Sequence, residues 1–234
     1  MLIYDFDKLK TDKLSNNTGA TVCDNSKTVA SHSDFIFIGV KPQVIKDCFD
    51  EIKDNIRDSS VIVSMAAGIE ISDIKKMSSH DKIIRIMPNL PVSVGKGVIL
   101  ASYENISEKE KLSFEAAMSK CGVFDWLDEK FIDSAGAVSG CGPAYAYMFV
   151  EALADGAVMC GLPRDKAVLY AAGMLSGAAE MVLKSGEHPE KLKDNVCSPG
   201  GTTIAGVKAL EDNGFRSAVI SSVEAAFKRT KELK

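Results

Sequence analysis

Short apolar runs that end in glycine or proline recur along the first half of the chain, at residues 34–42, 60–68 and 83–89. Continuous apolar runs of this length are typical of strands buried inside a parallel sheet. The segments between them have helical spacing, so strand and helix alternate as in an α/β domain. From Glu129 onward the apolar spacing is helical throughout, and alanine and glycine are frequent. The pattern predicts an α/β parallel-sheet domain over residues 1–128, followed by an all-α domain over residues 129–234.

Weaker signals complete the first domain. Residues 2–4 and 20–22 are predicted to be short strands on either side of a charged helix over 7–15, and a further helix is expected over 43–56. Ser107 is followed three residues later by a glutamate, which predicts a helix start, and residues 122–127 have the pattern of a last strand. Parallel strands place ligands beyond their carboxyl ends, so we expect the ligand crevice where the apolar runs end.

The second half predicts four long helices, over residues 142–161, 165–184, 204–213 and 215–234. The first of them is apolar on nearly every side, and the second is rich in alanine and glycine. A helix with one face in solvent normally has polar residues on that face. We therefore expect these helices to be buried against a second copy of the chain, as a homodimer. A self-contained helical bundle is the alternative.

A turn-rich run lies between the second and third of these helices, at residues 193–203. Ser198 is a helix-capping residue and Pro199 suits the first helical position, so the N–H groups of residues 200–203 are expected to point outward together. Such a helix start binds anions. The two glycines allow a ligand to approach the backbone, and three hydroxyls add donors, those of Ser198, Thr202 and Thr203. The run predicts a site for a small carboxylate, and the alternative is an ordinary loop with an N-cap.

Composition narrows the function classes. The net charge of −4 is spread along the chain without a basic stripe, which argues against a nucleic-acid surface. The N-terminal residues carry neither a basic leader nor an apolar segment of membrane-spanning length, so we expect a cytoplasmic protein that does not bind a membrane. The six cysteines include no C-x-x-C pair and the three histidines are far apart, so we expect buried thiols and no metal site.

A dinucleotide-binding domain normally opens with a strand and a Gly-x-Gly-x-x-Gly turn, which this sequence does not contain. Asp5, at the end of strand 2–4, matches the acidic residue that accepts from the adenine ribose after the second strand. We therefore expect that a first βα unit of roughly 25–30 residues is missing. Its loss would leave two unpaired sheet edges. The expected fold is an incomplete Rossmann-type domain followed by a helical dimerisation domain.

The helical half carries motifs that resemble those of the pyrroline-5-carboxylate reductase family, at residues 140–145, 153–156, 161–164, 192–196, 198–203 and 214–216. In the first half, residues 40–43, 66–68 and 85–89 resemble the same family's strand ends on the cofactor side. The resemblance implies reduction of 1-pyrroline-5-carboxylate to L-proline with NADPH or NADH, the last step of proline biosynthesis, in the cytoplasm for bacterial members. It also implies homodimers, and in many members rings of dimers, assembled through the helical domain.

The same resemblance implies roles for single residues. It places a group of residues beside the cofactor: Asp5, Ser26 (where the family usually has asparagine), Gly39, Val40, Lys41, Pro42, Met65, Ala66, Ala67 and Asn195. It places a second group beside the substrate: Glu129, Asn195, Ser198, Gly200, Gly201, Thr202 and Thr203. Thr203 is the expected catalytic contact, because its hydroxyl would bond the ring nitrogen while the helix start holds the carboxylate, setting C5 against the hydride.

Two other functions stay open on the sequence alone. A chain that lacks the pyrophosphate turn can be a non-catalytic dimeric protein that still binds a small carboxylate. The same architecture also suits a reductase of another imine or of a 2-hydroxy acid, although the 198–203 motif favours pyrroline-5-carboxylate over these other substrates.

Overall fold

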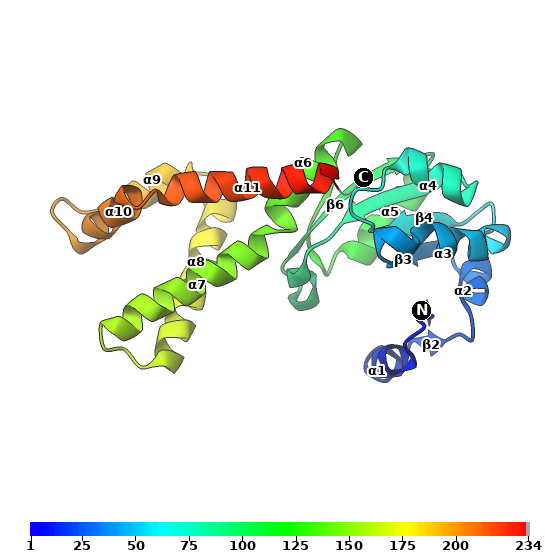
Figure 1. Cartoon of the computed structure of the whole chain (residues 1–234), viewed down its shortest axis with the longest axis horizontal. Helices are drawn as coiled ribbons and strands as arrows, with labels where there is room; N and C mark the ends of the chain where they lie inside the picture. Colours follow the sequence, from blue (N-terminus) through cyan, green and yellow to red (C-terminus); the bar gives the residue numbers. More distant parts are fainter. Residues whose placement is uncertain (233–234) are drawn as a thin grey trace. The chain divides into compact units, whose positions relative to one another are not determined.

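The computed structural model describes residues Met1–Glu232, which fold into two compact units (Figure 1). The first unit runs from Met1 to Gly140 and includes the end of the C-terminal helix from Phe227 onward. The second unit runs from Cys141 to Ala226 and consists of helices. The predicted combination of a parallel-sheet domain and a helical domain is confirmed.

The first unit is built on a five-stranded sheet in the order β3-β4-β5-β6-β7. Its three apolar runs form β3 (Phe35–Ile38), β4 (Val61–Ser64) and β5 (Ile83–Met87), which pair in parallel as predicted. The pattern did not indicate β6 (Gly97–Glu104), which runs antiparallel to β5 because only the short 3₁₀ helix η3 (Leu90–Val94) joins them. β7 (Gly122–Trp126) lies parallel to β6 at the edge.

A separate parallel sheet of two short strands comes first in the chain. β1 (Leu2–Ile3) and β2 (Thr21–Val22) are connected by α1 (Lys8–Thr18). In the usual order of such domains one more strand stands between this pair and β3. Within Met1–Glu232, β1 and β3 each have one edge without a neighbouring strand, as expected.

Helices cover both faces of the main sheet. On one face lie α2 (Ser26–His32), α3 (Ile45–Ile52) and α4 (Ile71–Ser78), which share a core with β3, β4 and β5. On the other face lies α5 (Glu108–Met118), where the buried ring of Phe114 packs against the sheet. α5 begins with the predicted capping box at Ser107. The helix expected over residues 43–56 is α3, preceded by η1 (Pro42–Val44) and followed by η2 (Lys53–Asn55).

The helix that follows β7 belongs to the first unit. α6 (Glu129–Ser139) buries Ile132 and Ala137, and a Cβ placed on Gly136 would lie 3.2 Å from Met87 Cγ on β5. The predicted boundary at residue 128 falls where strands give way to helices. The compact units divide one helix later, at Gly140, because α6 packs on the sheet.

The second unit contains the four expected helices and one more. The expected ones are α7 (Gly142–Met159), α8 (Arg164–Ser185), α10 (Thr202–Asp212) and α11 (Phe215–Glu232). The additional helix is α9 (Pro189–Val196). It includes residues 193–196, which were predicted to belong to the turn-rich run 193–203. α7 and α8 lie side by side, joined by a turn at Gly161 (Figure 1).

Large apolar side chains of the second unit are exposed in the single chain, including Tyr147, Met148, Leu169, Met174, Leu183 and Ile220. Helix α8 is also long and apolar enough to cross a membrane by length and composition, and only 11% of its apolar window is buried. Exposed apolar surface of this extent marks a place where another molecule packs.

Candidate functional site

The carboxyl ends of β3 and β4 lie next to each other and bring most of the predicted cofactor residues together. The N–H of Met65 donates to the carbonyl oxygen of Ile38 at 3.4 Å, which joins the two strand ends. A Cβ placed on Gly39 would lie 3.9 Å from Met65 Sδ. The segments that continue from these ends hold Val40, Lys41 and Pro42 on one side and Ala66 and Ala67 on the other.

This edge has the properties that a dinucleotide needs. Gly39 and Lys41 are exposed, so the backbone here is open to close approach. Ala66 is buried and fixes its segment to the core of the first unit. Small side chains at the carboxyl ends of parallel strands are where doubly wound sheets bind nucleotides, so the residues present fit such a cofactor.

Asp5 and Ser26, which were also predicted beside the cofactor, lie on separate elements of the first unit. Asp5 follows β1 in the small sheet, is exposed, and accepts the N–H of Asp7 at 2.9 Å. Ser26 is the first residue of α2, and its hydroxyl donates to Glu51 Oε1 at 2.7 Å. The hydroxyl of Ser26 is therefore already occupied on the α3 side.

In the second unit the predicted substrate run forms a tight turn before α10. The N–H of Gly201 donates to the carbonyl oxygen of Ser198 at 3.0 Å, and Gly200 has a φ of 67°. Proline followed by a residue with positive φ is the signature of a type II turn. Pro199 therefore occupies a turn rather than the first helical position, and the predicted N-cap at Ser198 is wrong: the N-cap is Gly201.

A helix start is still present, but it lies three residues further along the chain than predicted. α10 begins at Thr202, and no side chain caps its first turn, so the N–H groups of Thr202 and Thr203 face outward without a side-chain partner. A Cβ on Gly201 would lie 2.3 Å from Ser198 Oγ, which shows how close that hydroxyl stands to the helix start. Thr203 is half-buried, and Asn195 is exposed in the last turn of α9. The arrangement suits a small anion.

Glu129 is engaged inside the first unit. Its Oε1 accepts from Arg85 Nη1 at 3.1 Å and from the N–H of Ile71 at 2.8 Å. Arg85 also donates to Asp133 Oδ1 at 2.6 Å. Sequence reasoning missed Arg85 and Asp133, although an arginine inside an apolar strand is itself a signal, because a buried guanidinium needs partners.

Among Met1–Glu232 no group of three or more His, Cys, Asp or Glu side chains could hold a metal ion. All six cysteines are free thiols.

Comparison with known proteins decides the family. The chain is 43% identical to pyrroline-5-carboxylate reductase of Arabidopsis thaliana over 216 residues, which are 92% of this chain and 78% of the plant protein. It belongs to the pyrroline-5-carboxylate reductase family. Pyrroline-5-carboxylate reductase 2 of Bos taurus is also 43% identical, over 92% of this chain and 69% of that protein.

Solved structures of the pyrroline-5-carboxylate reductase family have the same fold. The Plasmodium falciparum enzyme, crystallised with NADP bound, is 34% identical and has a TM-score of 0.89, over 99% of this chain and 86% of that chain. The Coxiella burnetii enzyme is 30% identical with a TM-score of 0.89, over 100% and 88% of the two chains. Residues 2–68 also match the model described as NADP oxidoreductase, coenzyme F420-dependent.

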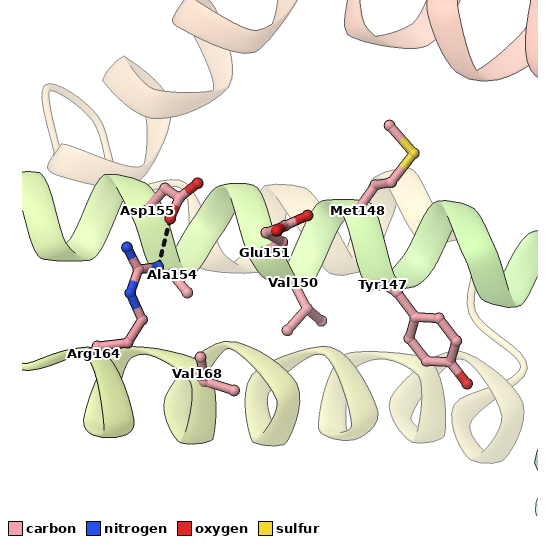
Figure 2. Close-up of a pocket in the computed structure, with 8 residues that line it drawn as sticks. All are labelled: Tyr147, Met148, Val150, Glu151, Ala154, Asp155, Arg164 and Val168. Carbon is pink, nitrogen blue, oxygen red and sulfur yellow. Dashed lines mark hydrogen bonds and ion pairs between the residues drawn. The ribbon is translucent and has the colours of Figure 1, made fainter.

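The helical half of this reductase is the family's dimerisation domain. Residues 129–233 match the model described as pyrroline-5-carboxylate reductase dimerisation. A groove of about 630 Å³ is lined by residues of α7 and α8, most of them apolar, together with Glu151 and the ion pair of Arg164 and Asp155. Figure 2 shows these side chains. None of the predicted site residues lines this groove. It lies among the exposed apolar residues that a second copy would cover, so we do not regard it as the substrate site.

Proposed function

We propose that this chain reduces 1-pyrroline-5-carboxylate to L-proline with NADPH or NADH, the last step of proline biosynthesis. The observation that carries the proposal is identity of 43% along 92% of the chain to a protein named for this activity. Two features, one in each unit, support it physically. One is a strand edge suited to a dinucleotide, and the other is an uncapped helix start suited to a carboxylate.

On the substrate side, we assign the carboxylate to the first turn of α10. The N–H groups of Thr202 and Thr203 would donate to it, and the backbone at Gly200 is uncovered, because nothing lies within 4 Å of a Cβ placed there. Thr203 Oγ1 then bonds the ring nitrogen and fixes C5 towards the hydride donor. Ser198 and Asn195 border the same turn. Because α10 and its turn are held by their own hydrogen bonds, these donors are oriented before substrate arrives.

On the cofactor side, we assign the nicotinamide to the edge formed by residues 39–42 and 65–67. The bound dinucleotide supplies the hydride. Gly39 and Ala67 allow the ring to approach the backbone, and Met65 provides an apolar surface that excludes water. We assign Asp5 to the adenine ribose, where its carboxylate accepts from a free 2′-hydroxyl. Ser26 is assigned to the adenosine end, where its bond to Glu51 must open or be shared.

The exposed apolar faces of α7 and α8 are assigned to the homodimer that the matched dimerisation domain supports. We propose further that dimers associate into rings and that the enzyme works in the cytoplasm. We therefore assign the exposed apolar face of α8 to contact with a second copy of the chain and not with a membrane. Its charged residues include Glu180 and Lys184, which form an exposed ion pair at 3.0 Å. Two charges one helical turn apart are costly in a bilayer and ordinary at a protein surface.

The test is substrate selectivity of the purified protein. We expect NADPH oxidation with 1-pyrroline-5-carboxylate, formation of proline in equal amount, and kcat/KM at least tenfold lower with a six-membered cyclic imine or with a 2-oxo acid. Preference for either competitor would indicate a reductase of another substrate. Binding of proline or of a carboxylate analogue without any turnover would instead support the non-catalytic binding protein.

A further inference from the structure

A buried charge network fixes α6 to the sheet of the first unit. Arg85 on β5 is only 1% exposed, and its guanidinium donates from Nη1 to Glu129 and from Nη2 to Asp133. The two carboxylates are four residues apart on α6, so they face the same point on the sheet. Within the described part of the chain, Met1–Glu232, Arg85 Nε has no hydrogen-bond partner. Burial of a guanidinium costs solvation energy, and an apolar replacement is often as stable, so stability alone does not account for the network.

Glu129 makes a second contact, which leads to the cofactor edge. The same Oε1 that accepts from Arg85 also accepts the N–H of Ile71, the first residue of α4, at 2.8 Å. The side chain of the N-cap residue of α4 makes no capping bond. A carboxylate 58 positions along the chain therefore caps this helix, where negative charge is favourable.

The segment between β4 and α4, residues 65–70, is short and is held at both ends. At its start the N–H of Met65 donates to Ile38, and the N–H of Ala66 donates to Ser64 Oγ at 3.4 Å. At its end Ile71 is held by Glu129. Because Ala66 is buried in the core, the middle cannot absorb a displacement at either end. Movement of the α4 start would therefore displace residues 65–67.

We propose that Glu129 is a positioning residue for the cofactor. Arg85 and Asp133 hold the Glu129 side chain, Glu129 holds the start of α4, and α4 sets the place of residues 65–67 against the nicotinamide. This inference rests on the proposed function and replaces the expectation that Glu129 contacts the substrate. It predicts that loss of the carboxylate changes cofactor binding and hydride placement, while substrate binding keeps its strength.

The experiment compares Glu129→Ala, Glu129→Gln and Asp133→Asn in the full enzyme. Glutamine keeps an oxygen that accepts from Ile71, so it should preserve NADPH binding, whereas alanine removes that acceptor. We expect Glu129→Ala to raise the NADPH Kd about tenfold and to lower kcat by about ten- to a hundredfold, with the KM for the imine within twofold of wild type. Asp133→Asn should lower the melting temperature and leave the NADPH Kd unchanged, because the Ile71 bond remains.

Hydrogen exchange of the Ile71 amide gives a second measurement that does not depend on turnover. Exchange should be faster in Glu129→Ala than in wild type and close to wild type in Glu129→Gln. An NADPH Kd that is unchanged in Glu129→Ala, or a rise confined to the KM for the imine, would overturn the positioning role. Wild-type protein that binds NADPH but does not reduce the imine would contradict the proposed function and leave the comparison of NADPH Kd values intact.

Discussion

Two glycines with the same backbone conformation make it possible to test the assignment of the substrate site separately from the stability of the protein. Gly200 in the turn before α10 has a φ of 67°, and Gly214 between α10 and α11 has a φ of 71°. At both positions a Cβ would meet nothing within 4 Å, so alanine brings strain but no collision. The left-handed conformation costs a non-glycine residue roughly 1–2 kcal/mol. Gly200→Ala and Gly214→Ala therefore introduce the same strain, which lowers the melting temperature wherever the backbone keeps its conformation.

Only the first substitution should change catalysis. The turn can relieve its strain by moving Ser198 and Gly201, and binding of the substrate carboxylate must then restore the original geometry. If the whole cost falls on binding, the KM for 1-pyrroline-5-carboxylate rises roughly 5- to 30-fold in Gly200→Ala. Gly214→Ala should keep this KM within twofold of wild type.

The assay follows loss of NADPH absorbance over a range of imine concentrations, with thermal unfolding measured on the same samples. A wild-type KM in Gly200→Ala, at a melting temperature close to that of wild type, would mean that the turn has moved without an effect on binding, and would refute the assignment of the carboxylate to this turn. An equal rise of KM in both variants would show that activity reports on stability alone.

Three further predictions follow. Thr203→Ala should lower kcat by one to two powers of ten, roughly 1.4–2.8 kcal/mol of transition-state stabilisation, with the NADPH Kd within twofold of wild type in a fluorescence titration. Asp5→Asn should raise the ratio of kcat/KM for NADPH to that for NADH, because a like charge near the 2′-phosphate is removed, and an unchanged ratio would remove Asp5 from the ribose site. Sedimentation should show even-numbered assemblies, and a monomer would contradict the dimer assignment.

The elements predicted most reliably were those that depend on interactions between residues close in sequence, or whose sequence pattern fits a single type of structure. β4 is buried at every position from Val61 to Ser64, and a strand enclosed on both faces has a nearly continuous apolar run. The capping box at Ser107 uses only residues within one helical turn. The apolar pattern did not predict β6. Its antiparallel direction beside β5 depends on the short η3 connection between the two strands, which the pattern does not reveal.

The site was harder to predict where one sequence suits two structures. Proline followed by glycine fits the first helical position and equally the centre of a type II turn, and the positive φ of Gly200 is what selects the turn. The engagement of Glu129 depends on Arg85, 44 residues away in the chain, which no local pattern reveals. The hydroxyl and glycine content of the 198–203 turn was nevertheless enough to suggest a carboxylate site.

The central claim is imine reduction by hydride transfer, and isotope labelling tests it most directly. Purified protein is incubated with 1-pyrroline-5-carboxylate and NADPH carrying deuterium on the transferred position of the nicotinamide, and the product is analysed by mass spectrometry and NMR. The account predicts proline with one deuterium, bound to C5, formed in amounts equal to the NADPH consumed. Absence of proline, or proline without deuterium at C5, would contradict it.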